Sequence, residues 1–547
     1  MDLRLSLSSP DWIVFTIVLG LSLVYGLYMS YKKKASQDSS SFFLGGRSMA
    51  WPIVGASIFA TNIGAEHLVG LSGDSYRYGL AAGHVEMLTV IPIGIAIVLL
   101  FPYYMKNKIF TVPEFLELRF TKQARSVFSI YMLVISVMTK LAFTIFAGAL
   151  VMNSLLGWDI MQTVVWVALI VAVFTIIGGY TAVAYTGMIQ VVIMIVGGIV
   201  MVAVGMDKVG GWSGLMQHVA AAGELTGKAD MMNVARPYND AVYPFWGILA
   251  TAFYAGVFYW GIDQVNVQRV LAAPDLKTAR NGAMFAILLK LLPVFIFALP
   301  GVIAFALWPE ALPGEASKQT FVLLLKELLP IGLKGLLLAS LLAALISSLI
   351  AVYNSISTLV VRDFLVKFKP DISEKKQVSA GRYIIMVAAL LGIGAAYLVY
   401  KNEEGLYKYL QTISAYLVLP IFPAILFGIV SKRVTAKGAG VSVLVGVLLS
   451  TIFVIDQLFP DFGKQIFPFL HHDLTLNFGY RGLWAEIIVT IVLFAVSAFT
   501  TKTAPEKLAT TTLNFEGGIT KFEGYKDWRF HLVVLTILTV LIYIWLW

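Results

Sequence analysis

The sequence predicts an all-helical integral membrane protein with about 14 transmembrane helices, and three observations support this fold class. The 547 residues are 59% hydrophobic and only 13% charged, whereas a soluble domain carries about 25% charged residues. The mean hydropathy is +0.83. The apolar stretches are as long as membrane-spanning helices, and their weak alternation of apolar and polar residues argues against a β-barrel.

Hydropathy places the spans in order along the chain. We expect them near 12–31, 51–74, 80–104, 127–153, 160–180, 183–206, 244–271, 280–306, 331–361, 378–400, 406–430, 436–457, 481–500 and 529–547. The first span is a peripheral membrane helix rather than a removable signal peptide. It is too long for a signal peptide, and the basic run Tyr-Lys-Lys-Lys at 31–34 ends it, as is typical of a membrane anchor.

Two spans are interrupted by glycine and polar residues. The 51–74 span has Gly64, Gly70 and Gly73, and the 244–271 span has Gly256 and Gly261, followed by Asp263-Gln264. Two broken helices at corresponding positions indicate a transporter built from inverted repeats. The alternative is that the glycines only allow helices to pack closely.

Counting five helices from each broken span divides the chain. We expect an inverted repeat 1 at 51–206, an outside loop at 207–243 and an inverted repeat 2 at 244–430. Three peripheral helices then occupy 436–547, with a cytoplasmic loop at 501–528. The odd number of helices gives the two repeats opposite orientations in the membrane.

The excess of basic residues is explained by the membrane topology. With the N-terminus outside, the loops predicted inside hold 26 of the 40 Lys and Arg residues, as the positive-inside rule requires. The net charge of +9 is therefore not a nucleic-acid-binding surface, and an even number of spans puts both termini outside. The absence of eukaryotic-type targeting features favours an integral protein of a bacterial inner membrane over other plasma membranes.

The sequence gives no sign of an enzyme. It contains no cysteine, which excludes disulfides, zinc thiolates and thiol catalysis. No phosphate-binding loop or metal-ligand spacing occurs, and the adjacent pair His471-His472 is expected to be solvated. We therefore expect no catalytic residues.

The most informative polar segment is 61–67, Thr-Asn-Ile-Gly-Ala-Glu-His, inside an otherwise apolar span. A charged side chain at the bilayer centre costs roughly 2.5–3.5 kcal/mol. Such residues face a cavity or a partner, so this segment predicts a polar binding site at membrane depth.

Several motifs in order resemble the sodium:solute symporter family, in particular its sodium/sugar (glucose/galactose) cotransporter branch. The resemblance extends over about 42–440, and it implies a LeuT-like core of 5+5 inverted repeats. The motifs are Ala60-Thr-Asn-Ile-Gly-Ala-Glu-His-Leu-Val-Gly-Leu-Ser-Gly, Thr111-Val-Pro-Glu-Phe-Leu-Glu-Leu-Arg-Phe, Ile177-Gly-Gly-Tyr-Thr-Ala-Val-Ala-Tyr-Thr, Tyr259-Trp-Gly-Ile-Asp-Gln with Gln268-Arg-Val-Leu-Ala-Ala, Ser347-Ser348 with Asn354-Ser355, and Tyr409-Leu-Gln-Thr-Ile-Ser-Ala-Tyr.

The resemblance implies a substrate site for a sugar. A hexose site needs convergent polar groups, which donate to and accept from the sugar hydroxyls, and an aromatic platform for the sugar ring. Each residue also has a plainer interpretation, as a packing residue or an interhelical hydrogen bond. The implied substrate-binding residues are Asn62, His67, Glu86, Lys290 and Gln411, with Tyr259 as platform and inner gate and Trp260 beside it.

The resemblance also implies a sodium ion as the coupling ion. Unwound backbone carbonyls at helix breaks supply hard oxygen ligands for sodium. The family's main sodium site corresponds to the carbonyls of Ala60, Ile63 and Ala344 and the hydroxyls of Ser347 and Ser348. Taken alone, the serine pair is equally compatible with helix packing.

The chain departs from the family at two places. Relatives that bind a second sodium have an aspartate and hydroxyls where this chain has Gly187, Ile350 and Ala351. We therefore expect one sodium per sugar, and the missing aspartate leaves the sodium release route open. Gly256 replaces an amide or hydroxyl of sugar-binding relatives, so the site is either roomier or one hydrogen bond poorer.

The resulting expectation is a secondary active transporter that couples inward sodium flow to sugar uptake by alternating access. The alternatives are a same-fold symporter for inositol, sialic acid or an amino acid, or a sugar sensor or leak channel. A carboxylate solute would call for an unpaired arginine, and the core helices offer Glu86 instead. The sequence does not distinguish a monomer from a homodimer.

Overall fold

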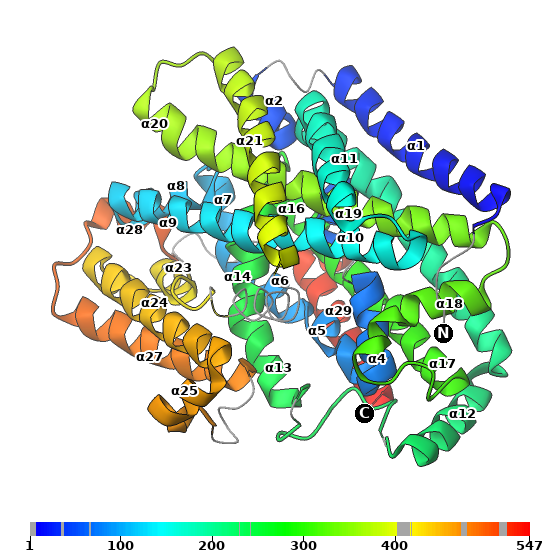
Figure 1. The fold of residues 1–547 in the computed structure, drawn as a ribbon. Helices are drawn as coiled ribbons and strands as arrows, with labels where there is room; N and C mark the ends of the chain where they lie inside the picture. The colour runs from blue at the N-terminus through cyan, green and yellow to red at the C-terminus, as the bar shows by residue number, and fades with distance from the viewer. Residues whose placement is uncertain are drawn as a thin grey trace.

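The computed structural model is all-helical over the residues it describes (Figure 1). No β-strand forms in this part of the chain, where the pairing of Arg236 with Pro244 is an isolated bridge. The described residues are 7–33, 38–64, 67–228, 230–240, 242–401, 416, 418–471, 478–513 and 522–546.

The first part of the chain folds into short and long helical segments joined end to end. They are α1 (Ser9–Lys32), α2 (Ser39–Leu44), η1 (Gly45–Arg47), α3 (Trp51–Asn62), η2 (His67–Leu71), α4 (Ser72–Tyr78), η3 (Gly79–Gly83), α5 (His84–Met87), α6 (Val90–Ile95), η4 (Ala96–Leu100), α7 (Phe101–Lys106), α8 (Val112–Arg119), α9 (Lys122–Ile135), η5 (Ser136–Leu141), α10 (Ala142–Leu156) and α11 (Ile160–Lys208).

The middle and the C-terminal part continue in the same way. Their segments are α12 (Gly211–Thr226), α13 (Phe245–Thr251), η6 (Ala252–Gly256), α14 (Val257–Gly261), α15 (Gln264–Leu271), α16 (Leu276–Lys290), η7 (Val294–Ala298), α17 (Leu299–Leu307), η8 (Gly314–Gln319), α18 (Thr320–Leu328), α19 (Leu333–Val360), η9 (Val361–Leu365), α20 (Val366–Phe368), α21 (Glu374–Lys401), α23 (Phe422–Val430), α24 (Ala436–Leu458), α25 (Pro460–Ile466), η10 (Pro468–His471), α27 (Phe478–Ala498), α28 (Pro505–Thr511), η11 (Gly524–Lys526) and α29 (Trp528–Trp545).

The predicted class, an all-helical membrane protein, is confirmed. By length and composition, ten helices of the described chain can cross a membrane, or eleven if the bent pair α13–α14 and α15 counts as one span. The helix α11 covers two expected spans, which meet at Gly179, where φ is 55° and only glycine is unstrained. Residues 406–415 and 417 of the expected 406–430 span lie outside the described residues.

Both expected helix breaks are present. The helix α3 ends at Asn62, and the next residue, Ile63, is extended at φ −82° and ψ 99°. The next described helical segment, η2, begins at His67. In the second span, a bend of 55° separates Gly261 from Gln264. Each break frees backbone carbonyls, which a membrane-spanning segment tolerates only where protein or a cavity surrounds them.

Close packing of three helices holds the first break in place. The helix α3 packs against α16 and α11, and α11 packs against α19. A Cβ atom at Gly55 would lie 2.5 Å from the carbonyl oxygen of Gly282, so only glycine allows α3 and α16 to approach this closely. Nearly every residue of α19 is buried, which makes it the central helix beside the break.

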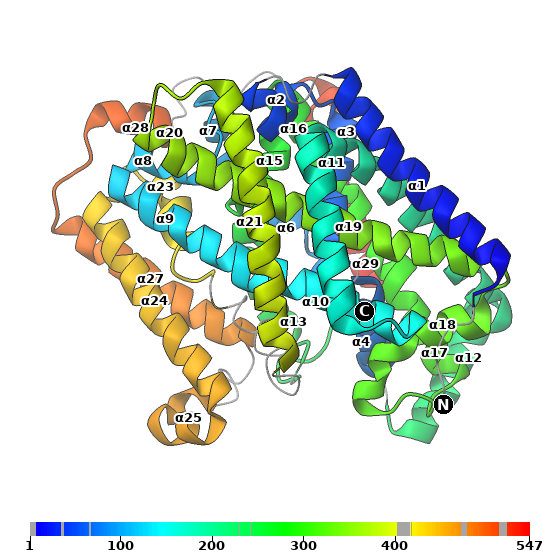
Figure 2. The same ribbon diagram turned by 45° about the horizontal axis from the view of Figure 1, so that its top comes forward.

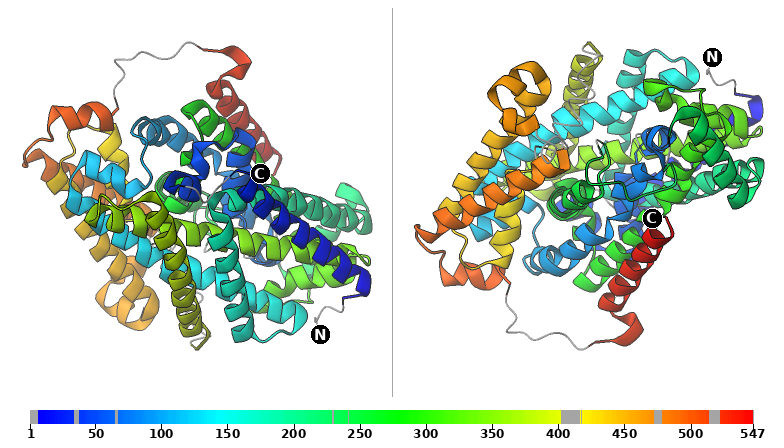
Figure 3. Two further views of the ribbon diagram at one scale, coloured as in Figure 1. Left: turned by 90° about the horizontal axis from the view of Figure 1, so that it is seen from above. Right: turned by 90° about the horizontal axis from the view of Figure 1, so that it is seen from below.

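The peripheral helices surround this core. The helices α24 and α27 pack side by side at one edge of the molecule, and α1 lies at the opposite edge (Figures 1 and 2). The helix α29 lies apart from the α24–α27 pair (Figure 3) and packs on α16 and α6. The expected 207–243 loop contains the helix α12. The repeat boundaries remain predictions.

Candidate functional site

The two breaks and their neighbours bring together six of the seven residues proposed for the solute. They come from five helical segments. Asn62 ends α3, His67 begins η2, Glu86 lies in α5, Tyr259 and Trp260 lie in α14, and Lys290 ends α16. The seventh, Gln411, lies outside the described residues.

Lys290 is the centre of this cluster. Its side chain is 1% exposed and its ammonium donates to the carboxylate of Glu86 and to the amide oxygen of Asn62. On the other side of Glu86, the Nε2 atom of His67 lies 3.5 Å from Oε1. A buried charge is stable only when it is paired and hydrogen-bonded, which explains why a lysine is tolerated in an apolar helix.

Two aromatic rings close the cluster from the second broken helix. The amide of Asn62 donates to the hydroxyl of Tyr259 at 3.1 Å, which joins the two breaks directly. The rings of Tyr259 and Trp260 meet edge to face, with centroids 5.0 Å apart. The ammonium of Lys290 lies 5.6 Å from the ring of Trp260. Polar groups and apolar ring faces therefore converge on one point.

The expected difference at Gly256 has a structural explanation. A Cβ atom there would lie 3.0 Å from Cβ and Cγ of Pro92, in α6. Proline fills the space beside this glycine, so we interpret the position as one hydrogen bond poorer rather than as roomier.

The residues proposed for sodium also lie together. The hydroxyl of Ser347 donates to the carbonyl of Ala60 at 3.0 Å and to that of Ala344 at 2.9 Å. The hydroxyl of Ser348 lies 3.4 Å from the carbonyl of Thr61, a fourth carbonyl that the sequence comparison with the family did not single out. Ile63, at the break itself, is fully buried. Several hard oxygens thus face one another between α3 and α19.

The position of the missing aspartate faces the same region. A Cβ atom on Gly187 would lie 3.2 Å from Cβ of Ala60, so α11 approaches α3 beside the proposed sodium ligands. Ile350 and Ala351 are fully buried and offer no side-chain oxygen. These three positions provide no side-chain ligand for a second sodium.

An ion pair at the second break is not predicted by the sequence analysis. Lys140, in η5, donates to the carboxylate of Asp263, at the second break. The sequence marks each residue separately, because both are charged within apolar spans. The pairing was invisible because 123 positions separate the two residues.

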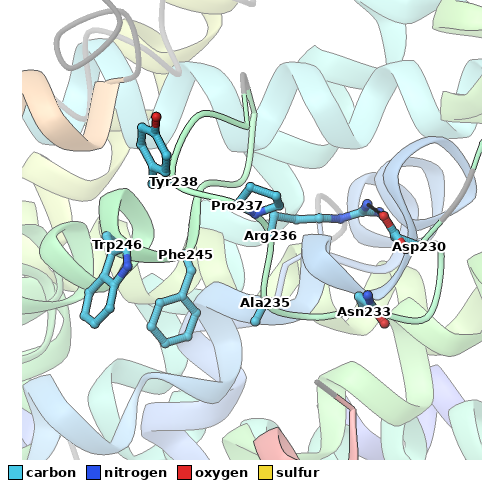
Figure 4. Close-up of a pocket in the computed structure, with 8 residues that line it drawn as sticks. All are labelled: Asp230, Asn233, Ala235, Arg236, Pro237, Tyr238, Phe245 and Trp246. Carbon is cyan, nitrogen blue, oxygen red and sulfur yellow. Dashed lines mark ion pairs between the residues drawn. The ribbon is translucent and has the colours of Figure 1, made fainter.

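A pocket of about 360 Å³ lies elsewhere, in the segment before α13 and at the start of that helix (Figure 4). The proposed solute and sodium residues do not line it. Within it, Arg236 and Asp230 are 3.9 Å apart, and Arg236 also donates to the carbonyl of Tyr78, which fastens this segment to the end of α4. Its lining residues are Asp230, Asn233, Ala235, Arg236, Pro237, Tyr238, Phe245 and Trp246.

Comparison with protein families assigns the chain. The family model described as the sodium:solute symporter family matches residues 42–446. The chain belongs to this family. It is therefore an integral membrane symporter that couples a solute to sodium, and not an enzyme, and sodium is its co-substrate rather than a cofactor.

The names of curated relatives mention two kinds of solute, glucose and myo-inositol. Sodium/glucose cotransporter 1 of Ovis aries is 32% identical over 527 residues, 90% of this chain and 79% of the relative. Sodium/myo-inositol cotransporter 2 of Bos taurus is 31% identical, over 93% of this chain and 79% of the relative. A sodium/glucose cotransporter of Vibrio parahaemolyticus is 30% identical, over 90% of this chain and 91% of the relative.

Solved structures show the same fold. A Na+-coupled sialic acid symporter in a substrate-bound outward-open state matches with a TM-score of 0.75 at 20% identity, over 91% of this chain and 99% of the other. Mhp1, a nucleobase-cation-symport transporter, matches with a TM-score of 0.54 at 15% identity, over 87% of this chain and 98% of the other. The LeuT-like fold is thus shown.

Proposed function

We propose that the chain uses inward sodium flow to take up a neutral sugar, a hexose such as galactose or glucose. The observation that carries this proposal is the cluster around Lys290, where an amide, a carboxylate and an imidazole converge beside two aromatic rings. Such a cluster matches the alternating donors and acceptors of a sugar and its apolar ring face.

The charge balance of the cluster favours a neutral solute over an anionic one. Lys290 already holds the carboxylate of Glu86, so a solute carboxylate would have to compete with it and would face a like charge. Like charges in a low-dielectric site repel strongly. This argues against sialic acid, whereas myo-inositol, which is a neutral polyol, stays the second candidate because relatives with that name match nearly as closely.

The proposed cycle follows from the two breaks. Sodium binds between α3 and α19, through Ala60, Ile63, Ala344, Ser347 and Ser348, and stabilises the state open to the outside. Solute then binds at the break and the two repeats rock around it. Each sodium that moves inward gains about 2.3 kcal/mol per 100 mV of membrane potential, which drives accumulation without ATP. We propose both termini outside and a bacterial inner membrane.

Binding of labelled galactose to the purified protein tests the solute class. We expect sodium-dependent binding that unlabelled glucose or galactose displaces and sialic acid does not, because only the neutral polyols fit the paired charges. Displacement by myo-inositol at lower concentration than by either hexose would make inositol the solute. Displacement by sialic acid alone would contradict a neutral-polyol site.

The proposed stoichiometry is one sodium per sugar, because Gly187, Ile350 and Ala351 supply no side-chain oxygen. We expect a ratio of charge flux to sugar flux near one, from currents and tracer uptake in the same proteoliposomes. In the Gly187→Asp variant, a carboxylate returns beside Ala60, and we expect stronger dependence on sodium concentration. A wild-type ratio near two would contradict the single-sodium proposal.

A further inference from the structure

The ion pair between Lys140 and Asp263 joins the second helix break to the helix α9–η5–α10. Asp263 is fully buried and lies at the second break, where its Oδ1 atom accepts the backbone N–H of Val265 at the start of α15. Its Oδ2 atom accepts from Lys140 in η5. One carboxylate therefore both begins the helix α15 and ties it to the helix α9–η5–α10.

Lys140 also lies against the residue proposed as the inner gate. Its ammonium is 5.7 Å from the centroid of the Tyr259 ring, which is a cation–π contact. The backbone carbonyl of Tyr259 accepts from the amide of Asn266, inside α15. The position of α15 and that of the Tyr259 ring are thus linked through the same pair of charges.

The other side-chain contacts of α15 include the guanidinium of Arg269 over the Tyr180 ring, 4.9 Å from its centroid, and the hydrogen bonds of two glutamines. Gln264 bonds the backbone of Val112 at 2.9 Å and of Phe110 at 3.0 Å, and Gln268 bonds Phe43 and Thr358. All residues of α15 are buried, so this half of the broken helix is fully packed in the structure. Lys140–Asp263 is the ion pair that the structure describes between α15's break and the surrounding helices.

We propose that Lys140 is a positioning residue of the transport cycle, and that its pair with Asp263 is a latch that keeps α15 packed and Tyr259 beneath the solute site. This proposal rests on the proposed alternating-access function. A buried ion pair is held strongly while water is excluded, since removing one partner leaves an uncompensated charge. The latch opens when α15 moves and water reaches both groups.

The absence of cysteine gives a direct test that needs no solute. Val267 in α15 is fully buried, so Val267→Cys provides a reporter whose reaction with a maleimide reports the opening of α15. The full chain is reconstituted in proteoliposomes, and the reagent is applied from each membrane face in turn. The reporter alone is compared with the same reporter carrying K140M/D263N, which removes both charges and leaves neither unpaired.

We expect Val267→Cys to be labelled from one face about tenfold faster when it carries K140M/D263N than when it is the only substitution. K140R, which keeps the charge at 140 and the cap at Asp263, is expected to keep labelling slow. The matched control is R481M/D456N, which removes a buried pair of 2.7 Å between the peripheral helices α27 and α24, and its labelling rate should not change.

A second readout separates a latch from a stabilising contact. In the K140M/D263N variant we expect the maximal rate of uptake to change about tenfold, while the solute concentration for half-maximal uptake changes less. Unchanged labelling in K140M/D263N, or equal acceleration in the R481M/D456N control, would overturn the latch. Accelerated labelling in a protein that takes up no sugar would retain the latch and reject the proposed solute, so the two failures are distinguishable.

Discussion

Replacing Lys290 by methionine is expected to reduce sodium-driven uptake by about 100-fold or more. The substitution removes the donor shared by Glu86 and Asn62 and leaves a carboxylate without its cation in a buried site. The solute-binding groups and the local packing then lose the side chain around which they are arranged. Tracer uptake into proteoliposomes, normalised to the amount of inserted protein, measures the effect.

Two variants separate lost recognition from lost folding. The neutral pair K290M/E86Q removes the uncompensated charge, so we expect normal insertion and thermal stability but still no uptake. Lys277→Met is the matched control, because this lysine pairs with Glu523 at the surface, where its side chain is 66% exposed. Uptake by Lys290→Met within tenfold of wild type would show that the solute binds elsewhere.

Replacing Ser347 by alanine is expected to raise the sodium concentration for half-maximal uptake about tenfold to 100-fold. Its hydroxyl bridges the carbonyls of Ala60 and Ala344, on the two helices that would enclose the ion. Ser348→Ala is expected to have an equal or smaller effect, since its hydroxyl lies 3.4 Å from one carbonyl. Sodium titration of tracer uptake measures both.

Ser340→Ala provides the comparison on the same helix. This serine is also buried in α19, but its hydroxyl bonds Leu336 of its own helix and Ile193 of α11. We expect its sodium dependence to match wild type. Equal shifts in Ser340→Ala and Ser347→Ala would assign the effect to helix packing and remove the serine pair from the proposed sodium site.

The sequence predicts the fold class and the two breaks well, because both depend on local composition. An apolar helix that contains 61–67 must place its polar groups in a protected site, and the glycines and Asp263 mark the second interruption. The structure bears out a break at Ile63 and a 55° bend before Gln264. These features need no knowledge of distant contacts.

The pairings were less accessible to sequence reasoning. Lys290 has no acid near it in the sequence, and its partner Glu86 is 204 positions away. The pair of Lys140 and Asp263 was missed for the same reason. Tertiary packing decides which buried charges meet, and local pattern carries little of that information. Gln411 lies outside the described residues, so its proposed role remains a prediction from resemblance.

The most direct test of the account is labelled galactose uptake into proteoliposomes with and without an inward sodium gradient, in wild type and in Glu86→Gln. We expect accumulation that requires the gradient in wild type and is lost in Glu86→Gln, because this carboxylate connects His67 with Lys290. Gradient-driven uptake that persists in Glu86→Gln would contradict the proposed site. Uptake that ignores sodium would contradict the coupling itself.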